Sequence, residues 1–299
     1  MMILTVKNFL KCYYKALVDT VVTHDGIEHS GYLAFLSLLS FFPFLVFFVA
    51  LAGYLGDLEI GREFVHILIS ALPEHMVEAL KPRIEEILSG PPQSLLTLAI
   101  IGTIWTASST VEGMRTILNR AYRVATPPAY IWRRLMSIIQ FLIMTFAVFC
   151  VMVLQILAPV FWQEFRNLFG VQEALFPPGW TYIRYGFSGL VVFVVVTISY
   201  YVLPNIRQRW QRVAPGALIV LVLWLGATEL LSAYVSRFQQ VNLVYGSLAG
   251  IIIALLYFYV SWIIYVYGAE FNYHLERALG HRFEQKEAIT KPHKQKKKP

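Results

Sequence analysis

Three acidic residues stand in apolar surroundings, where a charge is costly. Glu112 and Glu270 directly follow two long stretches without Asp, Glu, Lys or Arg, and Glu229 follows a third that is too short to cross a bilayer alone. A charge at the centre of a membrane helix costs roughly 2.5–3.5 kcal/mol on insertion scales, so each acid needs an ionic partner or a cavity. We expect Glu112 and Glu270 to be inner-side polar anchors and Glu229 to be an acid in the outer half.

Two interpretations of these acids stay open. A carboxylate inside a membrane can carry a proton or hold a polar group of a substrate. It can also form a structural ion pair, because Arg115 follows Glu112 at helical spacing and Arg184 and Arg237 lie near the expected depth of Glu229.

Polar and small residues accompany the acids on their helices. Trp105 and Ser109 share one helical face with Glu112, which gives that stretch a polar stripe that a lipid-facing helix does not need. Such stripes either line a substrate path or let two helices approach closely. The predicted cavity or interface residues beside the acids are Trp105, Ser109, Asn205, Tyr245 and Asn272.

Prolines and glycines mark expected kinks and close helix contacts. A proline inside a helix removes one backbone hydrogen bond, which membrane helices tolerate only against protein or water. Glycine lets two helices pack closely. The residues assigned to these roles are Pro43, Pro204, Pro215, Gly216, Gly246, Gly250 and Gly268.

Enzyme motifs are missing from the sequence. It contains no G-x-S-x-G elbow, no P-loop, no dinucleotide fingerprint and no paired cysteine motif. Its seven histidines are scattered, without the spacing of a metal site. We therefore expect no catalytic residues, no bound metal and no cofactor.

Six long uncharged stretches set the architecture. They span residues 29–56, 87–111, 135–163, 185–206, 213–228 and 238–269. About 20 apolar helical residues cross the hydrocarbon core, and backbone groups in lipid must be paired within the segment. The prediction is an all-α polytopic membrane protein with six transmembrane helices, at about 31–55, 94–112, 135–160, 184–204, 213–235 and 245–270.

Three further segments flank these spans. Residues 1–28 should form a cytoplasmic interfacial amphipathic helix before the transmembrane domain of residues 29–275. Residues 57–88 should form an outer-face helical hairpin between the first two spans. Residues 276–299 form a basic tail that we expect to be disordered and attracted to anionic lipids.

Lysine and arginine positions predict the orientation. Three precede the first span, five lie between the second and third, three between the fourth and fifth, and eight in the tail, against six elsewhere. By the positive-inside rule, both termini are cytoplasmic.

Several short segments together resemble the YihY/BrkB family of bacterial inner-membrane proteins. The segments are Leu-Ser-Phe-Phe-Pro at 39–43, Trp-Thr-Ala-Ser-Ser at 105–109, Leu-Pro-Asn at 203–205, Ala-Pro-Gly-Ala at 214–217, Tyr-Gly-Ser-Leu-Ala at 245–249 and Gly-Ala-Glu-Phe-Asn at 268–272. The resemblance implies a six-helix inner-membrane protein with both ends in the cytoplasm. The family also carries a ribonuclease label, but this chain offers no His and carboxylate motif and no soluble domain for RNA cleavage.

Two functional hypotheses follow. The first is a transporter or translocator of lipid or a small amphiphile, without ATPase activity of its own. The second is a non-transporting envelope or scaffold protein. Expected partners are the phospholipid bilayer, anionic lipids at the basic tail and a lipid or amphiphile substrate; a homo-oligomer is left open, and nucleic acid is not expected.

Overall fold

The computed structural model describes residues 6–54, 93–124, 131–146, 180–237, 249–281 and 284–285, which are mostly helical. In chain order the elements are α1 (Val6–Val18), the π-helical turn η1 (Asp19–Thr23), α2 (Gly26–Tyr54), α5 (Gln93–Ala121), a helix at 131–146, α7 (Trp180–Val202), β1 (Ile206–Arg207), α8 (Trp210–Arg237), α10 (Ala249–Ala278) and β2 (Glu284–Gln285). The hairpin expected over 57–88 lies outside the described residues.

Two of the described helices are long and apolar enough to cross a membrane. They are α8, over Trp210–Tyr234, and α10, over Ala249–Ala278, and α7 contains a shorter apolar segment at Gly186–Val202. Each described helix from α2 onward overlaps one of the six expected spans. Length and composition therefore support membrane helices in this part of the chain.

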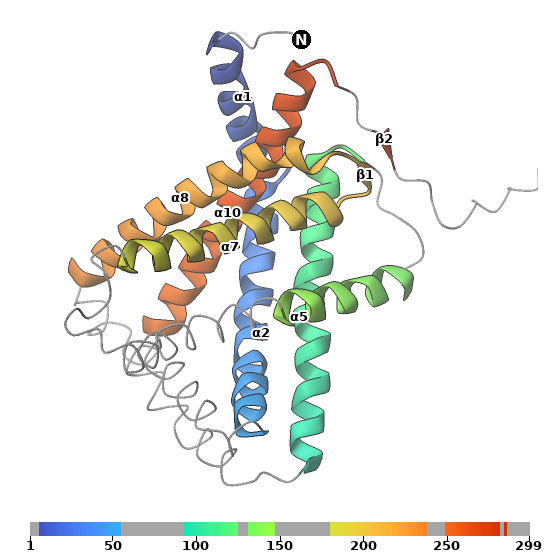
Figure 1. Cartoon of the computed structure of the whole chain (residues 1–299), viewed down its shortest axis with the longest axis vertical. Coiled ribbons are helices and arrows are strands. Elements are labelled where there is room, and N and C mark those ends of the chain that lie inside the picture. The colour runs from blue at the N-terminus through green and yellow to red at the C-terminus, as the bar shows by residue number, and fades with distance from the viewer. Residues whose placement is uncertain are drawn as a thin grey trace, which may run out of the picture.

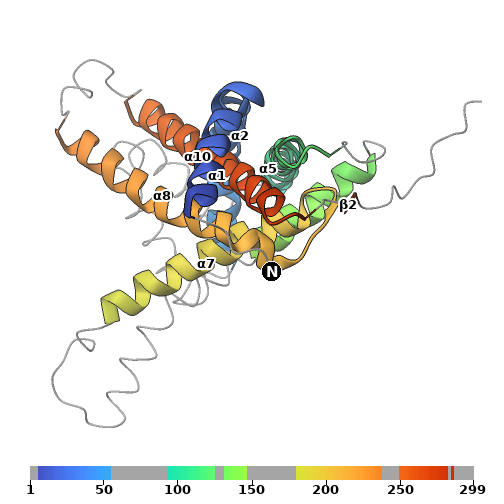
Figure 2. The same cartoon turned by 90° about the horizontal axis from the view of Figure 1, so that it is seen from above.

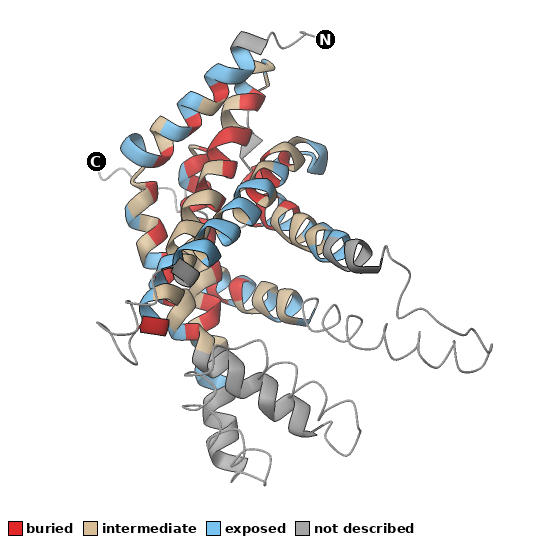
Figure 3. Ribbon diagram, turned by 90° about the vertical axis from the view of Figure 1, so that its left-hand side faces the viewer, coloured by how far each residue is buried: buried red, intermediate tan, exposed pale blue. Residues whose placement is uncertain are grey.

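Helix α10 occupies the centre of the arrangement and contacts α8, α2, α1 and α5. Helices α2 and α5 run antiparallel beside each other, while α7 and α8 form a second pair that crosses them at a steep angle (Figure 1 and Figure 2). The C-terminal ends of α5 and α7 and the N-terminal end of α8 converge around the C-terminal half of α10 (Figure 1). Most of the buried core lies at this convergence (Figure 3).

The surface of the described helices carries many large apolar side chains, and several polar side chains are buried. Large apolar side chains such as Leu230 and Phe146 are exposed by 74% and 67%, whereas Glu270, Asn272 and Glu276 are buried. Charged residues are almost never fully buried in soluble proteins unless they are paired. A lipid environment favours this arrangement. Hydrocarbon offers no hydrogen-bonding partner, so polar groups at that depth must find their partners within the protein.

Glycine and asparagine allow α8 and α10 to pack closely. A Cβ atom on Gly216 would overlap the carbonyl oxygen of Gly268 and the side chain of Asn272. The amide of Asn272 accepts a hydrogen bond from the Gly216 N–H at 2.7 Å and donates one to the Val213 carbonyl at 2.9 Å. These two bonds tie the second turn of α8 directly to the side chain of Asn272 on α10.

Two parts of residues 276–299, the expected disordered tail, have regular structure. Helix α10 continues through Ala278, and Glu276 within it pairs with Arg212 of α8 at 3.3 Å. Strand β2 pairs antiparallel with β1, with Ile206 opposite Gln285. Two-residue strands carry no periodicity that a sequence pattern could reveal.

Candidate functional site

A buried ionic cluster lies where η1, the turn after α5 and α10 meet. The guanidinium of Arg123 donates to Oε2 of Glu270 at 2.6 Å and to Oδ2 of Asp19 at 2.5 Å. The Glu270 side chain is fully buried and the other two are mostly buried. Arg123 thus links the segment before α2 to the last turns of α10.

Two histidines complete this cluster. Nε2 of His274 lies 2.7 Å from Oδ2 of Asp19, and Nδ1 of His24 lies 2.9 Å from Oε1 of Glu270. The second contact lacks the direction of a hydrogen bond, and neither of its two buried atoms has a hydrogen-bonding partner among the described residues. An unsatisfied buried polar atom usually indicates a bound water, ion or proton.

The backbone positions this cluster in two unusual conformations. Asp19 begins the π-helical turn η1, a rare conformation that occurs often at functional sites. Arg123 has φ 54°, in the left-handed region that non-glycine residues seldom adopt. Its guanidinium lies over the ring of Tyr273, 3.6 Å from the centroid, which holds the charge in place.

Electrostatics fix the protonation of two members of the cluster that lie before α2. Burial raises the pKa of Asp19, but hydrogen bonds from His274 and Thr23 and the charge of Arg123 lower it by more, so the net shift is downward. Burial and the charge of Arg123 lower the pKa of His24. At neutral pH, Asp19 is therefore a carboxylate and His24 a neutral imidazole.

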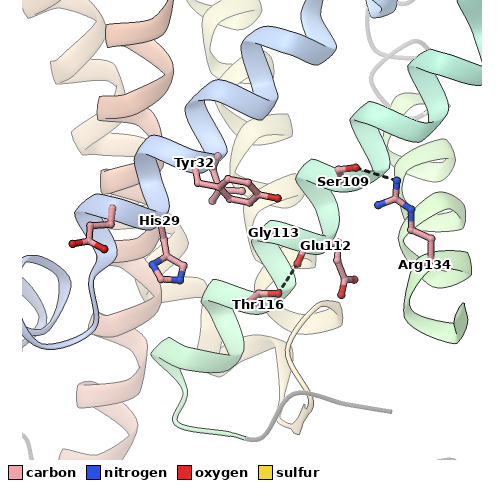
Figure 4. Close-up of a pocket in the computed structure, with 9 residues that line it drawn as sticks. His29, Tyr32, Ser109, Glu112, Gly113, Thr116 and Arg134 are labelled. Carbon is pink, nitrogen blue, oxygen red and sulfur yellow. Dashed lines mark hydrogen bonds between the residues drawn. The ribbon is translucent and has the colours of Figure 1, made fainter. Parts of the chain in front are cut away.

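A second polar site is a cavity of about 590 Å³ between α2, α5 and the helix at 131–146 (Figure 4). Glu28, His29, Tyr32, Leu33, Ser109, Glu112, Gly113, Thr116 and Arg134 line it. Its volume lies within the roughly 300–1,000 Å³ typical of small-molecule sites. Charged, hydroxyl and apolar groups share its wall, so an amphiphile could satisfy both kinds of surface.

Arginines surround Glu112 at the wall of this cavity. Its carboxylate oxygens lie 2.8 Å from Nε of Arg133 and 3.6 Å from Nε of Arg115, and the hydroxyl of Ser137 donates to it at 3.0 Å. Arg115 also donates to the side-chain oxygen of Gln140. Glu112 is thus paired with Arg115, as its spacing predicts, and additionally with Arg133.

Arg134 brings a third guanidinium to the same wall. It donates to the Ser109 hydroxyl at 3.0 Å (Figure 4). It also donates to the Trp105 carbonyl at 2.6 Å and lies over the indole ring, 4.3 Å from its centroid. Arg134 is only 9% exposed, and its Nε has no hydrogen-bonding partner among the described residues. A guanidinium in the wall of a cavity offers charge-assisted hydrogen bonds to an anionic ligand.

Comparison of the sequence with known proteins identifies its family. A model of the virulence factor BrkB family matches residues 17–292, which is most of the chain. The chain belongs to the BrkB family. It is 32% identical over 263 residues to the ribonuclease-like protein YfkH of Bacillus subtilis, covering 87% of this chain and 94% of that relative.

Other members of the family are named as membrane proteins. A UPF0761 membrane protein of Alteromonas mediterranea is 24% identical over 279 residues, covering 90% of this chain and 88% of the relative. A UPF0761 membrane protein of Tolumonas auensis is 38% identical over a shorter region of 77 residues, about a quarter of each chain. No solved structure matches the chain. The resemblance to the YihY/BrkB family is confirmed, and the chain is a membrane protein of that family.

The structure places the three predicted acids in different surroundings. Glu270 lies in the buried cluster and Glu112 in the cavity wall, so they serve different sites. Glu229 is exposed on α8 and belongs to neither. The side chains of Arg184 and Arg237, its suggested ionic partners, lie outside the described side chains.

The remaining predicted residues fall into three groups. Trp105 and Ser109 contact Arg134 beside the cavity, although Trp105 itself is 57% exposed. Asn272 and the backbone N–H of Asn205 join helix ends, the latter by donating to the Asn119 side chain at 2.8 Å. Tyr245 lies outside the described residues.

The predicted kink and packing residues also differ in their surroundings. Gly216 and Gly268 line the close contact of α8 with α10. Pro215 lies inside α8, and Pro204 is buried just after α7. Helix α2 continues through Pro43, Gly250 is buried at the start of α10, and Gly246 lies outside the described residues.

Sequence reasoning missed most of the buried cluster. The residues not predicted as site residues are Asp19, His24, Arg123 and His274. They come from distant parts of the sequence, since Arg123 and Glu270 are 147 residues apart and Asp19 and His274 are 255 apart. In the sequence they are recognisable only as polar residues close to the ends of apolar stretches. That position does not show which ends lie together in the folded protein.

Proposed function

We propose that this protein is a six-span transporter of the bacterial inner membrane, with both termini in the cytoplasm. Its substrate is a lipid or small amphiphile with an anionic head, and it has no ATPase of its own. The observation that carries this proposal is the cavity containing the buried Arg134.

The cavity combines the two surfaces that an amphiphile needs. Arg134 supplies a charged donor for an anionic head, and Glu112 supplies a carboxylate held between Arg115 and Arg133. Tyr32 and Leu33 supply apolar surface on the opposite wall. Charge-assisted hydrogen bonds are roughly twice as strong as neutral ones, so the guanidinium would dominate recognition of the head.

The surroundings of the cavity suit a lipid substrate. Exposed apolar side chains on the helix at 131–146, such as Ile143 and Phe146, face outward where a bilayer would lie. A lipid entering from the side could keep its tail in hydrocarbon while its head moved along the polar wall. Without an ATP-binding motif, directional movement would depend on an ion gradient or a partner.

The second candidate function is a non-transporting scaffold, and the ion pairs of Glu112 favour it. In a non-transporting scaffold, the contacts of Glu112 with Arg115 and Arg133 would be structural and the cavity would merely be filled by lipid. Buried ion pairs often stabilise a particular fold without further activity.

Reconstitution separates the two functions. The purified protein would be placed in liposomes containing fluorescent phosphatidylglycerol, and dithionite would quench the label on the outer leaflet. We expect the wild type to expose inner-leaflet label faster than empty liposomes. Arg134→Gln should slow this by about tenfold, or about 1.4 kcal/mol, which is near the value of one hydrogen bond to a charged group.

The control is Arg209→Gln, which removes an exposed arginine from the turn between α7 and α8. It should translocate like the wild type. Glu112→Gln tests the opposite charge in the same wall. Folded wild-type protein that moves no lipid, neither phosphatidylglycerol nor phosphatidylethanolamine, would support the scaffold instead.

A further inference from the structure

We infer that Asp19, Glu270 and His274, with His24 beside them, form a binding site for one divalent transition metal ion. A ligand atom from each of the first three residues lies within 4.8 Å of the others. The site is distinct from the cavity between α2 and α5, and it does not depend on the proposed transport function.

The donor set has the chemistry of a transition metal site. Imidazole nitrogen and carboxylate oxygen together suit zinc, manganese or ferrous iron, whereas calcium and magnesium prefer oxygen alone. Metal–ligand bonds of about 2.0–2.2 Å place neighbouring donors roughly 3 Å apart. The 2.9 Å separation of the His24 Nδ1 and Glu270 Oε1 atoms fits two donors that share one ion.

The buried Glu270 carboxylate supplies the independent support. Its Oε1 atom has no hydrogen-bonding partner among the described residues, although the side chain has no exposed surface. Nδ1 of His24, the atom next to it, is unsatisfied as well. A metal ion bound by both atoms would satisfy them.

Arg123 supports this arrangement rather than replacing the ion. It binds Oε2 of Glu270 and so leaves Oε1 for the metal, and it also holds one oxygen of Asp19. Donors that bind the second oxygen of a ligating carboxylate fix its orientation.

A neighbouring cluster offers a matched comparison within the same chain. Glu276 lies 3.3 Å from Arg212 and 3.1 Å from His281, so it too combines an acid, an arginine and a histidine. That cluster has one carboxylate, and it is not among the groups of three or more possible ligands in the described part of the chain. Glu276→Gln is therefore a control that changes a similar acid on the same helix.

The test is metal binding by the full-length protein in detergent. The protein would be treated with a chelator, freed from any histidine tag, and titrated with Zn²⁺ and with Mn²⁺ by calorimetry. We expect one ion per chain. Glu270→Gln and His274→Asn should weaken binding by at least about tenfold, the lower end of what even outer ligand partners contribute, and Glu276→Gln should not.

Thermal unfolding gives a second readout. The ion should raise the Tm of the wild type and of Glu276→Gln, and should leave Glu270→Gln unchanged. If Glu270→Gln does not fold, His24→Asn takes its place. Absence of saturable binding of either ion, or binding that survives in both Glu270→Gln and His274→Asn, would overturn the inference and leave a shared proton between His24 and Glu270.

Discussion

Gly216 of α8 and Gly268 of α10 lie backbone against backbone. A Cβ atom on Gly268 would come within 2.9 Å of the Gly216 carbonyl oxygen and 2.7 Å of the Tyr200 hydroxyl. The two helices that most clearly qualify as membrane spans therefore meet through residues without side chains. Small residues at such contacts let membrane helices gain van der Waals packing and short interhelical hydrogen bonds.

Replacing one of the two glycines tests this contact. Gly216→Ala should lower the stability of the detergent-solubilised protein by about 1–3 kcal/mol, as expected for overpacking. Thermal unfolding followed by circular dichroism or by size-exclusion recovery would measure it. Gly186→Ala is the control, because a Cβ on Gly186 meets nothing within 4 Å. Equal stability of the two variants would contradict the close packing.

Two arginine ion pairs at this end of the molecule should differ strongly in importance. Arg123→Met leaves the buried Glu270 carboxylate without its main partner, and breaking a buried pair costs about 3–5 kcal/mol. Arg120→Gln breaks an exposed pair with Asp25, which is worth about 0–1 kcal/mol. Unfolding temperatures of the two variants would be compared. A similar small loss in both would show that the Arg123 cluster is not buried in the folded protein.

The thiol of Cys12 gives a prediction about pH. Burial raises its pKa above the ordinary value, and the charge of Lys15 only partly offsets this. A raised pKa means less thiolate at any given pH, so maleimide labelling of Cys12 in a Cys150→Ser background should be slow near neutral pH and increase only in alkaline solution.

An engineered cysteine on the same helix provides the comparison for Cys12. Lys11→Cys, combined with Cys12→Ser and Cys150→Ser, places a thiol at an exposed position of α1. We expect it to label rapidly at neutral pH. Equal labelling rates at the two positions would mean that α1 does not pack on Phe271 and Leu275 of α10 as in the structure.

The expected orientation is open to a direct check. Reporter fusions at both ends should give fluorescent protein signal and no alkaline phosphatase activity, because the positive-inside rule predicts that both ends are cytoplasmic. A phosphatase-active fusion at either end would contradict an even number of spans or the inside placement.

The positions of the helices could be predicted from the sequence, but the contacts between distant helices could not. Hydrophobic length alone located the regions of α2, α5, α7, α8 and α10, because the bilayer imposes one length on every span. Glu270 and Asn272 stood out because polar residues in an apolar stretch need partners. Their partners were not predictable, since Asp19 and Arg123 approach from segments 104 residues apart in the chain.

The same limit applies to Glu229, which lies on an exposed face of α8. Polarity within an apolar segment is equally visible for a residue at a helix contact and for one on an exposed face. Which of the two applies depends on how the helix is rotated about its axis. The α8 sequence has apolar residues on every side, so it does not indicate which face is exposed. Arg134 shows the opposite case, because its charge near a helix start looked like an ordinary inner-loop arginine.

Photo-crosslinking tests the central claim, that the cavity holds the head of an anionic lipid, most directly. The protein would be irradiated in liposomes with a phosphatidylglycerol carrying a diazirine near its head, and adducts would be mapped by mass spectrometry. We predict adducts on peptides that contain Tyr32 or Gly113, reduced severalfold by Arg134→Gln and unchanged by Arg209→Gln. Adducts confined to outward residues such as Leu230, or equal in all three proteins, would contradict it.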